Sequence, residues 1–341
     1  MDIKAAIQHL VNGQNLTADQ MISLMRDTLS GQASDAQIGA FLVALQIKGI
    51  VESELLGAVT VMRELSTKVE ISDKTHLVDT CGTGGSGTNT FNISTAAAMV
   101  VACAGGKVAK HGNRGATSKS GSADLLEAAG VNLAVTPEAV AACVNDLGVG
   151  FMFAQSHHSA MKHVIGARKE IGVRTIFNLL GPLTNPASAP NQLLGVFDPQ
   201  WIEPMLQVLK ELGSEHVLIV SSDDGLDEIS LSATTRVGEL KDGIIKHFVI
   251  APEDFGLQRL SGYEALQVNG ANQSLEMVRG ALSYENKAAG DIVALNAGAA
   301  IYAANLAPDI AAGIAKAQEI LHSGKALQKL QELADYTAAQ A

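Results

Sequence analysis

The chain has 341 residues, of which 47% are hydrophobic and 17% charged, and its net charge at pH 7 is −11. This length is enough for about two domains, and the composition is that of an ordinary globular protein. The acidic balance argues against nucleic acid or an anionic membrane as a partner, so any anion must be held by a local site. Cys81, Cys103 and Cys143 show no disulfide or metal spacing, and no signal peptide is recognisable. We therefore expect a cytoplasmic protein.

The first 70 residues contain only helical patterns. Thr17 with Gln20 and Ser34 with Gln37 match the spacing of capping boxes, which mark the first residues of helices. Apolar residues recur after them at helical spacing. The sequence therefore predicts a small helical domain over residues 1–70.

From residue 71 onward, short apolar runs alternate with helical stretches. Strands are expected at residues 76–79, 107–110, 131–135, 150–154, 192–197 and 216–221, and helices at 94–104, 122–129, 137–146 and 200–212. This alternation is typical of a mostly parallel sheet with crossover helices. We expect an α/β domain over residues 71–341, with a hairpin that turns at Asp242 and Gly243.

The middle of the chain is harder to assign. We expect part of residues 155–190, which are helical between strands, to pack on the helical domain. On a single helix, His158 and Arg168 would share one face. The segment NPASAPNQ, residues 185–192, is the best candidate for a linker because its prolines and small polar residues resist both helix and sheet.

The segment DTCGTGGSGTNTFNIST, residues 79–95, places four glycines within six residues and contains no lysine or arginine. It follows an expected strand and precedes a helix that Ser94 could cap. Free backbone N–H groups at such a turn form an anion site. Glycine lets the backbone approach an oxyanion closely. The expected ligand of this glycine loop is therefore a phosphate group.

Three other interpretations of the glycine loop compete with this one. Gly82, Gly84 and Gly87 match the dinucleotide pattern G-x-G-x-x-G, but the region about 20 residues further on is basic and contains no acid. A P-loop needs lysine after its last glycine, whereas Thr88 follows Gly87. A turn that only connects two elements is disfavoured, because four glycines would weaken it.

Two further segments follow expected strands and carry charge. Residues 110–130 begin KHGNRGATSKSGS and are either a cationic phosphate loop or a solvated basic turn. Residues 221–232, SSDDGLDEISLS, are either a Mg²⁺ site beside a polyphosphate or an acidic surface loop. Loops that follow neighbouring parallel strands lie at the same sheet edge. Together these segments suit a ligand that carries several phosphates and Mg²⁺.

Residues 156–186 add a candidate for binding a carboxylate. Arg168 could pair with a carboxylate through two hydrogen bonds, although an ion-paired surface arginine is the better interpretation from spacing alone. From spacing alone, the favoured interpretation of His158 is likewise a partly buried structural histidine. Cys81 is expected to pack as a small hydrophobic side chain.

Four segments occur in an order that resembles the anthranilate phosphoribosyltransferase family: GTGGSGTNTFNIST, KHGNRGATSKSGSAD, RKEIGVRTIFNLLGPLTNP and DEIS. The resemblance extends over nearly the whole chain. It implies transfer of the phosphoribosyl group of phosphoribosyl pyrophosphate to anthranilate in tryptophan biosynthesis, with release of pyrophosphate. It also implies two Mg²⁺ ions and a homodimer formed through the helical domain.

The resemblance also assigns site residues. It implies that phosphoribosyl pyrophosphate is bound by Gly82, Gly85, Ser86, Thr90, Asn92, Ser94, Thr95, Lys110, His111, Gly112, Asn113, Arg114, Ser118 and Ser122, with residues 110–118 closing over it. Anthranilate would be bound by Gly82, Asn113, His158, Arg168 and Pro182, and Mg²⁺ by Ser94, Asp227 and Glu228. His111 is the candidate catalytic base.

One residue departs from the family pattern, and two other activities compete. Ser86 stands where the family loop usually has aspartate, which predicts altered binding of phosphoribosyl pyrophosphate or its metal. Pyrimidine nucleoside phosphorylases share the fold and a similar phosphate loop, but the HGNR and DEIS segments argue against them. Nucleic-acid-binding relatives are disfavoured by the net charge and by the retained Asp227 and Glu228.

Overall fold

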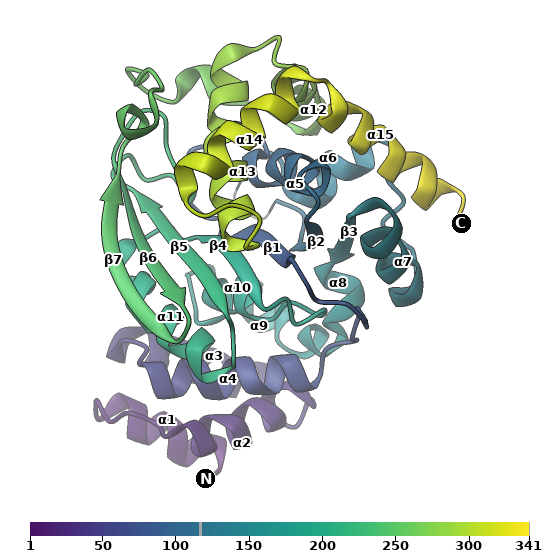
Figure 1. The fold of residues 1–341 in the computed structure, drawn as a ribbon. Helices are drawn as coiled ribbons and strands as arrows, with labels where there is room; N and C mark the ends of the chain where they lie inside the picture. Colours follow the sequence, from purple (N-terminus) through teal and green to yellow (C-terminus); the bar gives the residue numbers. More distant parts are fainter. Residues whose placement is uncertain (116–117, 341) are drawn as a thin grey trace.

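The computed structural model describes residues 1–115 and 118–340, and within them a seven-stranded sheet forms the centre of the molecule (Figure 1). The strands are β1 (Leu77–Gly82), β2 (Lys107–Gly112), β3 (Val149–Phe153), β4 (Asn191–Gly195), β5 (His216–Ser222), β6 (Thr235–Lys241) and β7 (Ile244–Ile250). Their order is β3-β2-β1-β4-β5-β6-β7. The first five strands pair in parallel, and β6 and β7 extend the sheet in antiparallel fashion.

Helices precede, cross and cover this sheet. They are α1 (Ile3–Val11), α2 (Ala18–Leu29), α3 (Asp35–Lys48), α4 (Glu52–Glu64), α5 (Ile93–Cys103), α6 (Ser122–Ala128), α7 (Pro137–Leu147), α8 (Ala154–His157), α9 (Ile165–Ile171), α10 (Phe177–Leu183), α11 (Ile202–Glu211), α12 (Ala271–Leu282), α13 (Lys287–Ala303), α14 (Ile310–His322) and α15 (Lys325–Ala338). Short 3₁₀ helices are η1 (Ser159–His163), η2 (Pro199–Trp201), η3 (Pro252–Phe255) and η4 (Glu264–Leu266).

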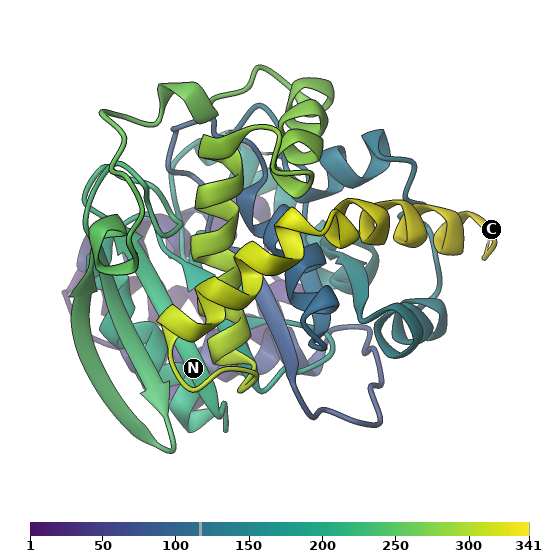
Figure 2. The same ribbon diagram turned by 45° about the horizontal axis from the view of Figure 1, so that its top comes forward.

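Hydrophobic cores lie on both faces of the sheet because neighbouring residues of a strand point to opposite faces. On β5, Leu218 and Val220 join the core beneath α5 and α12 to α15, whereas Val217 and Ile219 join the core beneath α10 and α11. Figure 2 shows α13, α14 and α15 laid across the first of these faces. Both faces are covered, which is why β5 is buried along its whole length.

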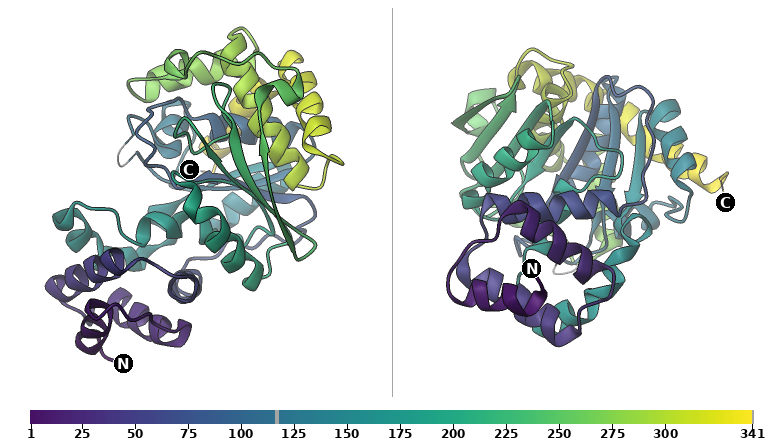
Figure 3. Two further views of the ribbon diagram at one scale, coloured as in Figure 1. Left: turned by 90° about the vertical axis from the view of Figure 1, so that its left-hand side faces the viewer. Right: turned by 90° about the horizontal axis from the view of Figure 1, so that it is seen from below.

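The second core continues into the N-terminal helices. Buried residues of α1 to α4 belong to the same cluster as those of α9, α10 and α11. Helices α1 to α4 lie below the sheet in Figure 1 and in the left view of Figure 3. Both predicted capping boxes are present, at Thr17 with Gln20 and at Ser34 with Gln37. The predicted fold class, a helical N-terminal domain followed by an α/β domain with a mostly parallel sheet, is confirmed.

Most predicted elements are confirmed, including the β6–β7 hairpin. Its turn residues Asp242 and Gly243 have φ of 52° and 75°, as a tight hairpin turn requires. The strand expected at 131–135 is wrong, because this segment is a loop between α6 and α7. There the amide of Asn132 donates to Thr337 Oγ1 at 3.0 Å instead of to a strand.

Two further predictions in the middle of the chain are wrong. His158 and Arg168 do not share one helix, since α8, η1 and α9 are separate and His158 caps the end of α8. Residues 185–192 are no exposed linker. Asn185 is buried and donates to Asp79 Oδ2 at 2.7 Å and to the carbonyl of Ala109 at 2.8 Å, and the segment leads directly into β4.

Within the described residues, the structure has no helix that is both long and apolar enough to cross a membrane.

Candidate active site

The candidate site lies where the parallel strands β1, β2, β4 and β5 end. Gly82, the last residue of β1, pairs with Gly195, the last residue of β4, and β5 ends beside them. The loops that follow these strands therefore meet at one sheet edge, as predicted. The contact is direct, because the amide of Gly84 donates to Asp227 Oδ2 at 2.9 Å across 143 residues of sequence.

The glycines of this loop are needed for its backbone shape. Gly84, Gly85 and Gly87 have φ of 64°, 79° and 73°, a region that other residues rarely adopt. A Cβ atom at Gly82 would lie 2.7 Å from Asp227 Oδ2. The loop can thus bring backbone N–H groups and the Asp227 carboxylate together without side chains between them.

Asp227 and Glu228 are adjacent but serve different neighbours. Asp227 faces the glycine loop, whereas Glu228 Oε1 accepts from the amide of Ser94 at 3.2 Å. Burial raises the pKa of Asp227, against a hydrogen bond from Ser86 that lowers it. Burial and then the Asp227 charge raise the pKa of Glu228 to about 8, and Lys110 opposes this shift. A bound cation would favour the ionised form of both carboxyl groups.

The other acidic residues of this loop point elsewhere. Asp223 forms an ion pair with Arg236 at 3.1 Å, and Asp224 accepts from the hydroxyl of Ser230 at 2.5 Å. The predicted group of four carboxylates is thus reduced to the pair Asp227 and Glu228.

Lys110 is the cation whose charge acts on Glu228. Its ammonium group is buried, donates to the carbonyl of Thr80 and lies 3.2 Å from Ser94 Oγ. Ser94 does not cap α5, whose N-terminal residue has no side-chain cap. Burial lowers the pKa of Lys110, and the charge of buried Asp79 opposes that shift. Ser94 thus stands between the ammonium group and the Glu228 carboxylate.

The loop after β2 holds its own polar groups. Arg114 forms ion pairs with Asp124 at 3.1 Å and Glu127 at 2.8 Å on α6. Asn113 accepts from the amide of Arg114 at 2.8 Å. The guanidinium of Arg114 is therefore engaged on α6 in this structure. Residues 116 and 117 of the expected closing segment lie outside the described residues.

Asn92 joins the two phosphate-loop candidates. Its Oδ1 accepts from Ser120 at 2.9 Å and from Ser274 of α12 at 2.7 Å, and its Nδ2 donates to the carbonyl of Ser120 at 3.2 Å. Nearby, the Thr95 hydroxyl at the start of α5 is buried and has no partner among the described residues. The remaining predicted ligands also lie in these loops or at the ends of their strands. They are Thr90, beside Gln267, Gly112, beside Phe153, and Ser118 and Ser122, which donate to the carbonyls of Ser120 and Asn113.

Two neutral histidines lie together on the side of α10. The rings of His111 and His158 are 5.0 Å apart, and burial lowers their pKa values to about 3 and about 4. His111 Nδ1 lies 3.2 Å from the carbonyl of Gly181, which only accepts, so Nδ1 carries the proton. The Nε2 atoms of both rings are buried and lack a partner among the described residues. Pro182 follows Gly181 within α10.

Arg168 lies on α9 with its guanidinium 5.1 Å from the centre of the Phe177 ring. Burial lowers its pKa, and no carboxylate among the described residues offsets this shift. A half-buried arginine without an acidic partner fits a ligand carboxylate better than the ion-paired surface arginine considered above.

Sequence reasoning missed two residues at this site. Arg174, in the connection from α9 to α10, donates to the carbonyl of Gly85 and stacks on Phe197. Asp79, buried in β1, accepts from the amide of His111 at 3.1 Å. Asp79 begins the segment of the glycine loop, and Arg174 lies in the segment RKEIGVRTIFNLLGPLTNP, but no role was expected for them because each contacts a residue far away in the chain.

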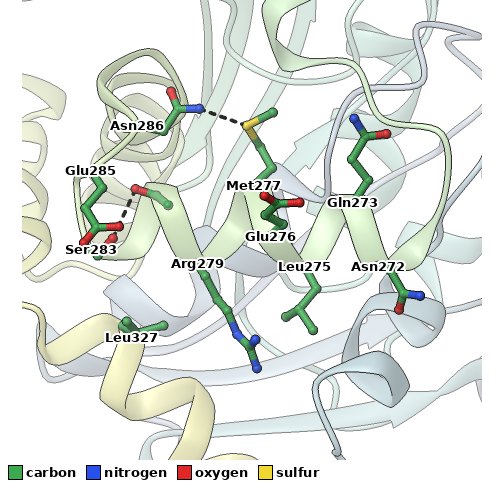
Figure 4. A pocket seen from close by; sticks show the side chains of 11 residues that line it. Asn272, Gln273, Leu275, Glu276, Met277, Arg279, Ser283, Glu285, Asn286 and Leu327 are labelled. Atoms are coloured by element: carbon green, nitrogen blue, oxygen red, sulfur yellow. Dashed lines mark hydrogen bonds between the residues drawn. The ribbon is translucent and has the colours of Figure 1, made fainter.

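A groove elsewhere on the surface has a volume of about 770 Å³ and is formed by α12, the connection from α12 to α13, and Leu327 of α15 (Figure 4). None of the predicted site residues lines it. We therefore place the candidate active site at the sheet edge and not in this groove.

The donor atoms at the sheet edge fit Mg²⁺. The described residues contain no group of three or more His, Cys, Asp or Glu side chains that could hold a metal ion alone. Asp227, Glu228 and the Ser94 hydroxyl nevertheless offer hard oxygen ligands beside a phosphate loop. Mg²⁺ is commonly held by one or two carboxylates and completed by substrate phosphates and water. The site thus fits an ion that arrives with a polyphosphate.

Comparisons with known proteins agree with this geometry. Residues 74–327 match the model of the glycosyl transferase family a/b domain, and residues 4–66 match its helical bundle domain. The anthranilate phosphoribosyltransferase of Hahella chejuensis is 56% identical over 99% of this chain and 98% of its own length.

Solved structures are similar over the same extent. The crystal structure of the anthranilate phosphoribosyltransferase from Thermus thermophilus has a TM-score of 0.91 and 41% identity, covering 98% of this chain and 99% of its own. That from Saccharomyces cerevisiae in complex with PRPP and Mg has a TM-score of 0.90 and 27% identity, covering 99% and 98%. The chain therefore belongs to the anthranilate phosphoribosyltransferases, a family of glycosyltransferases.

Proposed function

We propose that this chain transfers the phosphoribosyl group of phosphoribosyl pyrophosphate to the amino group of anthranilate. The products are N-(5-phosphoribosyl)anthranilate and pyrophosphate, and the reaction is a step of tryptophan biosynthesis. The contact of the glycine loop with Asp227 carries this proposal, because a glycine-rich loop suited to phosphate lies against a carboxylate suited to Mg²⁺. The yeast relative has been solved with PRPP and Mg, and also with 4-fluoroanthranilate.

Phosphoribosyl pyrophosphate binds at the glycine loop and the N-terminus of α5. Backbone N–H groups there would donate to its phosphate oxygens, and Lys110, 3.2 Å from Ser94 Oγ, would supply a positive charge. We assign to this substrate Gly82, Gly85, Ser86, Thr90, Asn92, Ser94, Thr95, Lys110, His111, Gly112, Asn113, Arg114, Ser118 and Ser122.

Magnesium is held by Ser94, Asp227 and Glu228. Since Asp227 faces the glycine loop and Glu228 faces Ser94, the two carboxylates support two positions, which favours two ions. Bound Mg²⁺ neutralises charge on the leaving pyrophosphate. The raised pKa values of both carboxylates fit a site that is completed by a cation.

Anthranilate binds beside α9 and α10. Arg168 pairs with its carboxylate, and the unpartnered Nε2 of His111 accepts a hydrogen bond from its amine. With a pKa of about 3, His111 is a weak base. This suffices once the amine has bonded to carbon, because the nitrogen is then strongly acidic. Gly82, Asn113, His158 and Pro182 line the rest of the path.

The chemistry needs placement more than a strong base. The bond from ribose C1 to the pyrophosphate oxygen breaks as the amine nitrogen approaches C1 from the opposite face. Loop N–H groups and Lys110 stabilise the charge that develops on the leaving group. Arg168 and His111 hold the amine in line with ribose C1. Holding two reactants in this geometry is itself a large source of rate enhancement.

We also propose a homodimer formed through the helical domain, in the cytoplasm. Ile47 of α3 and Val11 of α1 are large apolar side chains that are 81% and 66% exposed, and we assign them to this interface. Ile47→Glu should convert a dimer to a monomer in light scattering. The domain boundary near residue 70 is part of this proposal.

The experiment that tests the activity follows the fluorescence of anthranilate. The signal should decay only with enzyme, phosphoribosyl pyrophosphate and Mg²⁺ together, and not when Mg²⁺ is chelated. Phosphorolysis of thymidine or uridine is measured in parallel. A flat anthranilate trace with folded protein, or a phosphorolysis rate above it, would overturn the proposal.

A further inference from the structure

Arg174 connects two parts of the proposed site that come from different layers of the molecule. It lies in the five-residue connection between α9 and α10, and its guanidinium donates to the carbonyl of Gly85 in the glycine loop. The same guanidinium lies 4.1 Å from the centre of the Phe197 ring, after β4. The amide of Phe197 in turn donates to Thr83 Oγ1 at 3.2 Å. Of the two contacts of Arg174, one is therefore made with the glycine loop directly and the other with Phe197, which is hydrogen-bonded to that loop.

The connection that carries Arg174 also continues from the helix of Arg168. The amide of Gly172, with φ of 64°, closes α9 by donating to the carbonyl of Arg168 at 3.3 Å. Only Val173 separates Gly172 from Arg174. At the same end of α9, Ile171 lies 3.9 Å from the Cβ position of Gly39 in α3, so α9 packs on the N-terminal helices. A contact made by Arg174 thus links the glycine loop with the helix that presents Arg168.

The geometry of the peptide bond makes this contact sensitive to a bound anion. In a trans peptide the carbonyl of Gly85 and the amide of Ser86 point in opposite directions. Arg174, by holding the carbonyl, turns the Ser86 N–H group away from itself. A phosphate that accepts from this N–H polarises the same peptide and strengthens the hydrogen bond to Arg174. Gly84, Gly85 and Gly87 leave the loop few other restraints.

We propose that Arg174 is a positioning residue that couples the two substrate sites. Pyrophosphate groups bound to the glycine loop fix Arg174, and the connection from α9 to α10 then holds Arg168 where it meets the anthranilate carboxylate. Anthranilate consequently binds more tightly after phosphoribosyl pyrophosphate. This inference rests on the proposed function, because it uses the substrate assignments of the glycine loop and of Arg168.

The test measures a coupling factor between two ligands. The Kd of anthranilate is measured from its fluorescence with and without saturating Mg²⁺-pyrophosphate, an unreactive probe that stands for the leaving group. Couplings between sites typically lie between about 5-fold and 150-fold. We expect at least a fivefold tightening with the unmodified chain. Arg174→Met, which keeps apolar contact with Phe197, should reduce the factor to about one and leave the Kd without pyrophosphate within twofold.

Two further variants make the test specific. Arg259→Met removes an exposed arginine that pairs only with Glu253 at 2.7 Å among the described residues, and it should keep the full coupling factor. Phe197→Leu weakens the stacking and should give an intermediate factor, which keeps the test valid if Arg174→Met does not fold.

The outcomes separate the inference from the proposed function. Full coupling in Arg174→Met, or no coupling in the unmodified chain, overturns the inference while turnover of anthranilate remains. An unmodified chain that neither turns over nor binds anthranilate overturns the proposed function, and the inference with it.

Discussion

Replacing Ser86 by aspartate should change the charge balance at the metal site. The Ser86 hydroxyl lies 2.9 Å from Thr88 Oγ1, and its hydrogen bond lowers the pKa of Asp227. Ser86→Asp removes this donor and adds a second carboxylate beside Asp227. Without metal, the two negative charges repel each other and the substitution should lower stability. With a Mg²⁺ ion between them, both charges attract the ion and the substitution should raise stability.

The size of this effect follows from elementary electrostatics. Two unit charges about 4 Å apart repel by about 4 kcal/mol at an effective dielectric constant of about 20, and by about 1 kcal/mol in water. Ser86 and Asp227 are both partly exposed, so the cost should lie nearer the lower figure. The lost hydrogen bond to a charged group adds about 1.5 kcal/mol or more. We expect the metal-free variant to be less stable by about 2–3 kcal/mol.

Thermal unfolding in EDTA and in Mg²⁺ measures the stability change, and steady-state kinetics measure the KM for phosphoribosyl pyrophosphate across Mg²⁺ concentrations. Ser86→Asp should lose stability in EDTA, regain it with Mg²⁺ and reach half-maximal activity at lower Mg²⁺. Ser86→Asn, which has the same shape without the charge, should lack the gain from Mg²⁺. An unchanged KM together with an unchanged Mg²⁺ dependence would refute the reasoning.

Three other predictions concern single residues. Arg168→Ala should raise the KM for anthranilate about 10-fold to 100-fold, the loss of one charged hydrogen-bonded pair, and a large fall in kcat at unchanged KM would contradict its role. The raised pKa of Glu228, about 8, means that the native state keeps a proton that the unfolded state loses. Metal-free stability should therefore fall from pH 5 to pH 8 in urea titrations, and an equal slope in Glu228→Gln would exclude this cause. His111, with a pKa of about 3, should show a neutral imidazole with the proton on Nδ1 by ¹⁵N NMR at pH 5, and an imidazolium there would disprove the tautomer.

The strands and the loops that follow them were predictable from the sequence because their signals are local. Continuous apolar runs mark strands that are buried on both faces, and loops after parallel strands must meet at one edge. The strand expected at 131–135 shows the limit of this reasoning. Val131 is buried as an apolar run suggests, yet the next amide pairs with Thr337, 205 residues away.

The segment 185–192 shows the same limit for polar residues. Its prolines and amide side chains are typical of exposed linkers, but Asn185 and Asn191 are buried because distant strands satisfy them. Asn185 donates to Asp79 and to the carbonyl of Ala109, and Asn191 donates to the carbonyl of Leu77. Composition predicts whether a segment resists helix and sheet, whereas its burial depends on partners far away in the chain.

The positive charges of the site also come from residues that are distant in the chain from the glycine loop. The glycine loop carries none, and Arg114, the guanidinium expected nearby, is engaged by carboxylates of α6. The charge is supplied by Lys110 from the neighbouring strand and by Arg174 from the connection after α9. A buried ammonium group is tolerated only beside an opposite charge, which Asp79 supplies from β1.

Asp79 therefore supports both halves of the site at once. Its charge favours the ammonium form of Lys110, which lies against Ser94 on the phosphate side. Its Oδ1 accepts from the amide of His111, which faces the anthranilate side. One buried carboxylate of the sheet thus acts on a residue at each substrate site, through its charge at Lys110 and through a hydrogen bond at His111. A reaction that depends on placing an amine in line with ribose C1 benefits from this arrangement more than from a stronger base.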